Sequence, residues 1–204
     1  MVIRELKPSK HVQGRWLAMM EDGSVLRVGE NEVIQFSLYR GKELSEEEAE
    51  ELLRSARRSG LKEKAMDLLA RKQQSRRELE RKLEEWEASE EEAEAICSRL
   101  EELGFLDDGR YAVQVVRHYC AKGYGLRKIR DELYRRGVPR ALWDDALEQA
   151  EDPAQAIDAF LEKKLRGSQQ PKDLKKASDA LARRGYSWSQ ISEGLRRYGA
   201  EIEE

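Results

Sequence analysis

The amino-acid sequence predicts a mainly α-helical protein, in which three tandem three-helix, helix-turn-helix-like repeats form an elongated array behind a small β-rich N-terminal module. Three observations support this prediction: the composition, a repeat of about 50 residues, and a change of pattern near residue 44. Of the 204 residues, 39% are charged and 39% are hydrophobic. Such a chain has too few large apolar side chains for one thick core, so small helical units that share buried surface fit better.

The N-terminal module is expected to span residues 1–44. Four short runs in it hold β-branched or aromatic side chains, at residues 2–6, 15–20, 24–28 and 32–39. The dipeptide Asp22-Gly23 lies between two of these runs and is typical of a hairpin turn. We therefore expect a small sheet.

A connecting helix is expected at residues 45–60. Ser45 and Glu48 have the spacing of a capping box, which marks the start of a helix. Gly60 is placed to end it as the C′ residue, because glycine adopts the left-handed conformation that such a position requires.

The remainder of the chain aligns with itself at offsets of 50 and 48 residues. Three stretches begin at Ser75, Gly125 and Asp173, and apolar side chains recur at equivalent places in each. The third helix of each repeat is expected to start at Ser89, Pro139 or Ser187, which are good N-cap or first-turn residues. The predicted boundaries are 61–106 for repeat 1, 107–151 for repeat 2, and 152–204 for repeat 3 with an acidic tail.

The stretch RLEELGFLDDGRYA at residues 99–112 contains two adjacent carboxylates behind a helix-breaking segment. Gly104 is expected to end one helix, Phe105 to fold back as the hydrophobic contact of that cap, and Asp107 or Asp108 to cap the next helix. A catalytic or metal site would need further converging groups, and His118 is the nearby candidate. Helix capping is the preferred interpretation.

The same segment resembles the signature of the RecX family. SRRELERKL upstream and KGYGLRKIRDELYRRGV downstream resemble the first and second repeats of that family, and the likeness extends from Leu61 to Tyr198. Glu87 stands where the other two repeats have Gly137 and Gly185, so repeat 1 lacks the usual glycine turn. The residues that carry the motif, mainly structural in role, are Gly104, Phe105, Leu106, Asp107, Asp108 and Tyr111.

The resemblance implies a bacterial regulatory protein that binds the RecA filament on single-stranded DNA. The regulator would lie along the helical groove of the filament and mostly inhibit filament growth, ATP hydrolysis and strand exchange. The resemblance thereby implies a part in homologous recombination, DNA repair and the SOS response. The partner would be the filament, with direct contact to single-stranded or duplex DNA as a further expectation, and the chain is expected to be a monomer.

The distribution of charge points to the surface that would contact such a partner. Residues 1–109 carry 19 basic and 26 acidic side chains, whereas residues 110–200 carry 19 basic and 12 acidic ones. The basic side chains recur in the second helix of each repeat, which favours a partner surface over isolated solvated charges. The candidate contacts are Arg77, Arg127, Lys128, Arg130, Arg135, Arg136, Lys172, Lys175, Lys176, Arg183 and Arg184.

Aromatic side chains are the other candidates for contact. Tyr124, between two glycines and beside basic residues, is a candidate for stacking on a base, although packing over the turn is the alternative. Trp86 is either a local core residue or an exposed contact. Trp143 and Trp188 are expected to lie in the core of their repeats.

The sequence bears on two other classes of function. A helix-turn-helix protein that reads duplex DNA directly is the alternative, but the third helices of repeats 1 and 2 are acidic and would face phosphates. An enzyme is disfavoured because the sequence has no glycine-rich phosphate loop, no pairing of nucleophile with base, and no metal-ligand spacing. No cofactor is expected. Cys97 and Cys120 form no disulfide pattern, and the absence of a signal peptide or apolar span predicts a cytoplasmic protein.

Overall fold

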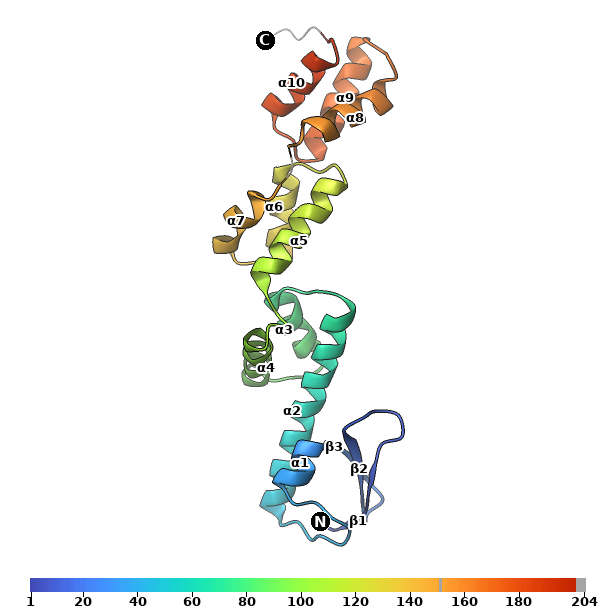
Figure 1. Ribbon diagram of the computed structural model, residues 1–204, viewed down its shortest axis with the longest axis vertical. Helices are drawn as coiled ribbons and strands as arrows, with labels where there is room; N and C mark the ends of the chain where they lie inside the picture. Colours follow the sequence, from blue (N-terminus) through green and yellow to red (C-terminus); the bar gives the residue numbers. More distant parts are fainter. Residues whose placement is uncertain (151, 201–204) are drawn as a thin grey trace. The chain divides into compact units, whose positions relative to one another are not determined.

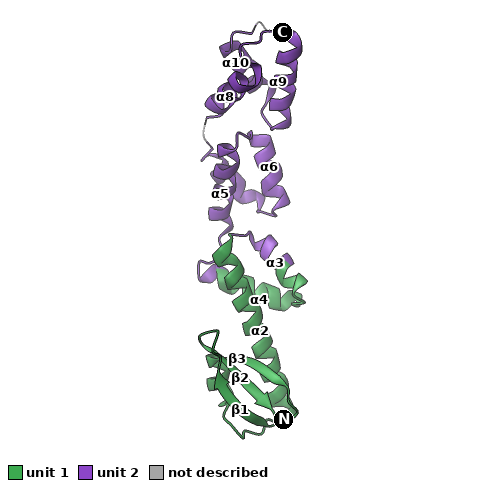
Figure 2. Cartoon of the chain, turned by 90° about the vertical axis from the view of Figure 1, so that its right-hand side faces the viewer, with its two compact units in different colours: residues 1–72, 82–100 green, residues 73–81, 101–204 purple. Residues whose placement is uncertain are grey.

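The computed structural model describes residues 1–150 and 152–200, so the predicted acidic tail at 201–204 lies outside the described residues. The chain divides into two compact units (Figure 2): residues 1–72 with 82–100, and residues 73–81 with 101–204. The boundary runs through helix α3 (Arg76–Glu85), so the segment predicted as repeat 1 contributes to both units.

The first unit begins with a three-stranded antiparallel sheet of order β1-β2-β3 (Figure 1). The expected turn joins the second and third strands: the Ser24 amide donates to the Asp22 carboxylate at 2.8 Å, and Gly23 has φ of +85°. The strands are β1 (Ile3–Pro8), β2 (Arg15–Met20) and β3 (Val25–Gly29).

The prediction of a strand at residues 32–39 is wrong. The chain forms helix α1 (Glu30–Gln35) there, followed by a turn in which Ser37 has φ of +45°. The Glu32 carboxylate accepts from the Gly29 amide at 2.9 Å and so satisfies a free donor at the start of the helix. Phe36 is buried in the core that includes the sheet, while Ile34 is exposed. In so short an apolar run, the sequence pattern does not distinguish a helix from a strand.

Helix α2 (Glu46–Arg71) starts at the predicted capping box, where the Glu48 amide donates to Ser45 Oγ at 3.1 Å. The prediction that Gly60 ends this helix is wrong, because α2 continues for eleven residues beyond it. The reason is the apolar stripe: the buried side chains of Ala56, Leu61 and Ala65 keep one helix face against the protein interior on both sides of the glycine.

Glu32 connects the sheet module to α2. Its carboxylate is buried and accepts from Ser55 Oγ at 3.0 Å and from Ser59 Oγ at 2.6 Å. Burial acts to raise the pKa of Glu32, but the hydrogen bonds from Ser59, Ser55 and Gly29 outweigh it and hold the pKa below 4.5. The lowered pKa means that this carboxylate stabilises the fold above pH 4.5 and that its contribution is lost as the pH falls through the lowered value.

Helix α4 (Glu90–Glu102) follows a turn that contains the unusual Glu87. Glu87 has φ of +64°, the left-handed value that Gly137 and Gly185 adopt in the other repeats, with φ of +70° and +91°. The Arg57 guanidinium donates to the Glu87 carbonyl. Repeat 1 therefore keeps the same turn without the glycine. Ser89 caps α4 as expected, since its Oγ accepts from the Glu92 amide at 3.1 Å.

The second unit contains two three-helix groups with separate apolar cores. The core of the first centres on Val116, Ile129 and Leu133, and that of the second on Leu161, Leu181 and Ile191. The first group comprises α5 (Asp108–Ala121), α6 (Leu126–Arg135), a 3-10 turn (Arg140–Leu142) and α7 (Trp143–Leu147). The second group comprises α8 (Ala154–Leu165), α9 (Pro171–Arg183) and α10 (Trp188–Arg197).

The segment between α4 and α5 confirms most of the capping interpretation. Gly104 has φ of +72°, and Asp107 caps α5 by accepting from the Arg110 amide at 2.8 Å. Asp108 instead accepts from the Arg76 amide at 2.7 Å and thus caps α3. The expectation that Phe105 folds back as the packing contact is wrong: Phe105 is 55% exposed, and Leu106 is the buried neighbour.

Candidate partner-binding surface

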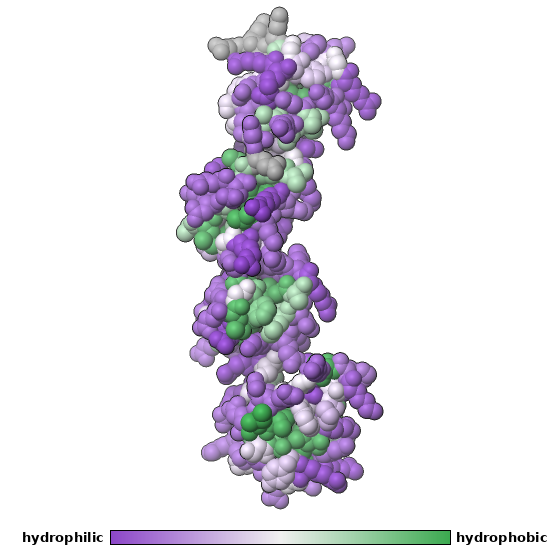
Figure 3. All heavy atoms as spheres, in the orientation of Figure 1, coloured by the Kyte–Doolittle hydropathy of each residue, from purple (hydrophilic) through white to green (hydrophobic). Residues whose placement is uncertain are grey.

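Basic side chains gather on α6 and α9, the second helices of the two three-helix groups. Hydrophilic side chains cover most of the face seen in Figure 3, as a chain with 39% charged residues requires, so charge alone does not identify a site. A sharper distinction is between cations that hold an ion pair within the chain and cations that do not. In the described part of the chain, five exposed cations of these two helices form no ion pair: Arg127, Arg130, Lys172, Lys175 and Arg183.

Other predicted contacts are engaged inside the protein. Lys128 Nζ lies 3.3 Å from the Glu132 carboxylate, and Arg135 pairs with the same group. Burial acts to raise the pKa of Glu132, but hydrogen bonds, from Arg135 and Lys128 among others, outweigh it and lower the pKa. Lys176 lies 3.9 Å from Asp173. These cations have a structural partner that a reversal of charge would disrupt.

The N-terminus of α6 meets the C-terminus of α9 through backbone hydrogen bonds. The Gly125 amide donates to the Arg184 carbonyl at 2.9 Å, and the Arg127 amide donates to the Gly185 carbonyl at 3.2 Å. The free amides at the start of α6 thus pair with carbonyls at the end of α9. A Cβ added at Gly185 would lie 2.4 Å from the Lys128 backbone nitrogen, so glycine is required for this approach.

An equivalent joint lies between the N-terminus of α3 and the C-terminus of α6. Ser75 Oγ donates to the Arg136 carbonyl, and a Cβ added at Gly137 would lie 2.5 Å from Arg77 Cβ. The second helices therefore meet end to end in the order α9, α6, α3. We call these three helices and their exposed cations the α9–α6–α3 column. Arg77 is its cation on α3 and lies 3.2 Å from Glu80.

The predicted contact Arg136 belongs to this second joint. Arg136 Nη1 donates to Tyr111 Oη at 2.7 Å and lies 3.4 Å from the Glu78 carboxylate, to which the tyrosine hydroxyl donates at 2.7 Å. Burial, followed by the bond to Glu78, raises the pKa of Tyr111 to about 12. Arg136 and Tyr111 thus hold α3 against the following group.

The two aromatic candidates for stacking or contact, Tyr124 and Trp86, are half-buried, and each lies beside a cation of its own unit. The Arg184 guanidinium lies 5.9 Å from the Tyr124 ring centroid and 4.6 Å from that of Phe160. The Lys64 ammonium lies 5.7 Å from the Trp86 ring centroid. A cation–π contact of this kind occupies one face of the ring, so that face is not free for a base.

Two exposed aromatic side chains are absent from the contacts that the sequence predicts. Tyr134 on α6 is 71% exposed. The prediction that Trp188 lies in the core is wrong, because it is 63% exposed. Trp143, also predicted to lie in the core, is half-buried against the core of its group and donates to the Val138 carbonyl at 2.9 Å. Tyr134 follows Arg127 and Arg130 at positions i+7 and i+4, the same helix face, and this spacing was the available signal.

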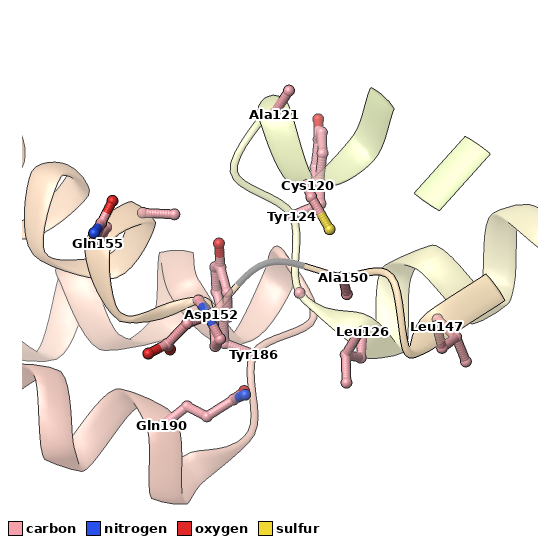
Figure 4. Close-up of a pocket in the computed structure, with 13 residues that line it drawn as sticks. Cys120, Ala121, Tyr124, Leu126, Leu147, Ala150, Asp152, Gln155, Tyr186 and Gln190 are labelled. Atoms are coloured by element: carbon pink, nitrogen blue, oxygen red, sulfur yellow. The ribbon is translucent and has the colours of Figure 1, made fainter. Parts of the chain in front are cut away.

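A cavity of about 670 Å³ lies between the two groups of the second unit (Figure 4). Cys120, Leu126 and Tyr186 are among the residues that line it, and its charged lining residue is Asp152. The described residues that line it include no lysine, arginine or histidine.

Across residues 1–150 and 152–200, the structure brings together no three histidine, cysteine or carboxylate side chains in a metal-binding arrangement. Among these residues, no helix is both long and apolar enough to span a bilayer.

Comparison with known proteins agrees with this architecture. A family model described as RecX, first three-helix domain, matches residues 62–100, and the model of the second three-helix domain matches residues 107–147. The regulatory protein RecX of Pseudomonas entomophila (strain L48) is 38% identical over 130 residues, which cover 62% of this chain and 84% of that protein. The regulatory protein RecX of Stenotrophomonas maltophilia (strain K279a) is 36% identical over 137 residues, or 66% of this chain and 84% of that one.

A solved structure extends the likeness to nearly the whole length. The crystal structure of a regulatory protein RecX matches with a TM-score of 0.74 at 25% sequence identity, covering 96% of this chain and 98% of that chain. The chain therefore belongs to the RecX family of regulatory proteins, which are not enzymes.

Proposed function

We propose that this chain regulates RecA by binding the RecA filament on single-stranded DNA, and that it restrains filament growth, ATP hydrolysis and strand exchange. Membership of the RecX family supports RecA as the partner. The observation that supports the place of contact is the set of exposed, unpaired cations on α6 and α9. This regulation would take place in the bacterial cytoplasm.

A column of spaced cations is better suited than a single pocket to binding a filament. The end-to-end joints at Gly125 and Ser75 hold successive second helices in fixed order, so their cations are spaced along a line rather than gathered at one point. A polymeric partner with repeating negative charge would contact many of them at once. Each exposed cation contributes little to folding, which leaves these side chains available for binding.

The test is a charge reversal confined to the unpaired cations of the column. We expect Arg127→Glu, Arg130→Glu, Lys175→Glu and Arg183→Glu together to leave the helical content unchanged, because none of the four holds an ion pair within the described chain. Inhibition of RecA ATP hydrolysis on single-stranded DNA should fall by at least tenfold. Inhibition by the unaltered chain should weaken as salt is added, because salt screens such contacts.

A matched control reverses four exposed cations that lie elsewhere and also hold no ion pair in the described chain. The set is Arg40→Glu, Arg58→Glu, Arg117→Glu and Lys163→Glu, which changes the net charge by the same amount. The control should keep most of its inhibition. Equal losses from the two sets would show that overall charge governs binding and would contradict the proposal for this face.

A further inference from the structure

Two large apolar side chains are exposed on the turn between α4 and α5. Leu103 is 44% exposed and Phe105 is 55% exposed, whereas Leu106, on the same turn, is buried. Apolar surface that is left in water gains free energy when a partner covers it. Leu106 supplies the buried contact of this turn, so the ring of Phe105 is available for a contact outside the chain. We call residues 103–107 the Phe105 turn.

The backbone of the Phe105 turn is fixed at both ends. At its start, Gly104 has φ of +72°, and its amide donates to the Glu101 carbonyl at 2.9 Å. At its end, the Asp107 carboxylate accepts from the Arg110 amide at 2.8 Å. A segment that is already ordered loses little conformational entropy when a partner covers it. Burial of the ring would therefore contribute most of its free energy to affinity.

A largely buried polar side chain lies beside the ring. Gln74 is only 9% exposed, and in the described part of the chain its side-chain amide forms no hydrogen bond. Gln74 and Phe105 both line a crevice of about 20 Å³, which has room for one water-sized group. An unpaired amide of this kind costs free energy, and a donor or acceptor from a partner removes that cost. The crevice thus offers a polar contact next to the apolar one.

The charges around the Phe105 turn favour a protein partner over a nucleic acid. Residues 99–112 carry four carboxylates and two arginines, and one of these, Arg110, lies 3.9 Å from Asp107. The carboxylates still outnumber the cations when Arg76, which lies 2.5 Å from Glu101, is added. A phosphate group would therefore meet net negative charge here, in contrast to the α9–α6–α3 column. The surface that complements this turn is an apolar pocket bordered by cations.

We infer that Phe105 and Leu103 dock into an apolar, cation-bordered pocket on the protein part of the filament, a RecA subunit, and that the Gln74 amide pairs with a polar group at the border of that pocket. The inference rests on the proposed function for the identity of the partner. It adds a contact of a different physical kind: salt screens the contacts of the column, whereas it does not screen the burial of an aromatic ring. Aromatic side chains in fixed positions are the usual anchors of protein interfaces.

The experiment measures the concentration of the full chain that gives half-maximal inhibition of RecA ATP hydrolysis on single-stranded DNA. We expect Phe105→Ala to raise this concentration about tenfold, because truncation removes the buried area of an anchor. Leu103→Ala should raise it by a smaller factor, and Phe105→Leu should keep most of the inhibition. The factor for Phe105→Ala should be the same at low and high salt, whereas the factor for the charge reversal of the column should shrink as salt is added.

Matched controls remove exposed apolar side chains from the first unit. Tyr39 is 61% exposed and Ile34 is 76% exposed. Tyr39→Ala and Ile34→Ala should inhibit RecA as well as the unaltered chain does. Thermal melting should show that Phe105→Ala is as stable as the unaltered chain, since the ring lies mostly in water. Losses of inhibition by the two controls as large as that of Phe105→Ala would overturn the inference, because the Phe105 turn would then have no special part.

The same assay separates this inference from the proposed function. Full inhibition by Phe105→Ala, at the concentration at which the unaltered chain inhibits, overturns the inference and leaves the proposed function standing. Absence of inhibition by the unaltered chain removes the proposed function, and the inference with it.

Two further measurements test other occupants of the Phe105 turn. Binding to a fluorescein-labelled oligothymidylate without RecA should be the same for Phe105→Ala and for the unaltered chain, and a loss would make nucleic acid the occupant. Sedimentation velocity should give the same mass for both proteins. A dimer of the unaltered chain that Phe105→Ala dissociates would make a second copy of the chain the occupant, and either result would overturn the inference.

Discussion

Glu87 occupies a left-handed backbone conformation, which only glycine adopts without a cost in free energy. Its φ of +64° lies in the left-handed region, where a Cβ costs about 1 to 2 kcal/mol, and the equivalent turns of the other repeats use Gly137 and Gly185. The side chain of Glu87 is exposed. Its backbone carbonyl accepts a hydrogen bond from Arg57, and the carbonyl of any residue at this position could accept the same bond. The turn is thus retained by its surroundings and not by the side chain of Glu87.

Replacing Glu87 with glycine should therefore stabilise the protein. We expect Glu87→Gly to raise the free energy of unfolding by about 0.5 to 1 kcal/mol, because relief of the backbone strain exceeds the added entropy of the unfolded chain. Denaturation by urea, followed by circular dichroism, measures this change. Glu87→Ala keeps the Cβ and should give no such gain, so equal stabilisation by alanine would contradict the explanation by strain.

Gly60 is a glycine at a helical position that does not require one. It lies within α2 without a left-handed φ, and a Cβ added there meets no atom within 4 Å. Glycine in a helix interior costs about 1 kcal/mol relative to alanine. The glycine therefore weakens the middle of a long helix for no packing reason that the structure displays.

We expect Gly60→Ala to raise the free energy of unfolding by about 0.5 to 1 kcal/mol and to raise the helical content slightly. Had Gly60 been the C′ residue that its sequence suggests, alanine would be forced to positive φ and the variant would be less stable. Gly104→Ala provides that comparison, because Gly104 has φ of +72° and is expected to lose about 1 kcal/mol. Thermal melting of the two variants measures both changes.

Helix boundaries that depend on neighbouring residues were predictable from the sequence. Three of them are N-caps, at Ser45, Asp107 and Ser187, and each uses a side chain within four residues of the backbone amide that it caps. The fourth is Gly104, whose lack of a Cβ permits the left-handed φ that ends a helix. The β-branched run at 32–39 was misassigned because a short apolar run suits a strand and a helix equally. Local sequence signals thus predict where a helix starts more reliably than whether a short apolar run forms a helix or a strand.

The candidate surface was predictable only as a set of residue types. The recurrence of basic side chains predicts the second helices as the elements of the candidate surface, but periodicity does not show which cations find a carboxylate partner. Arg127 and Lys128 are adjacent in sequence, yet Lys128 pairs with Glu132 while Arg127 is free in the described structure. Likewise, the exposure of Trp188 depends on packing between α9 and α10, which the apolar pattern of α10 alone does not reveal.

The joint between α6 and α9 determines how the three-helix groups of the second unit are held together. Gly185 allows it for two reasons: its φ is +91°, and its Cα lies so close to Lys128 that a Cβ would clash with backbone. Gly167 has a similar φ of +88° but no atom within 4 Å of an added Cβ. Substitution at Gly167 therefore measures the cost of the backbone conformation alone, whereas substitution at Gly185 adds the loss of contact between the two three-helix groups.

We expect Gly167→Ala to lower the free energy of unfolding by about 1 to 2 kcal/mol through strain alone, and to leave inhibition of RecA unchanged at temperatures where the protein is folded.

Gly185→Ala should break the hydrogen bonds from Gly125 and Arg127 as the clash separates the groups. Each group retains its own apolar core, so helical content should persist while the cations of α6 and α9 lose their fixed spacing. Inhibition of RecA should then fall several-fold, because binding must restore that spacing. Equal inhibition by the two variants would show that the two groups act as independent binding modules and that the joint has no part in recognition.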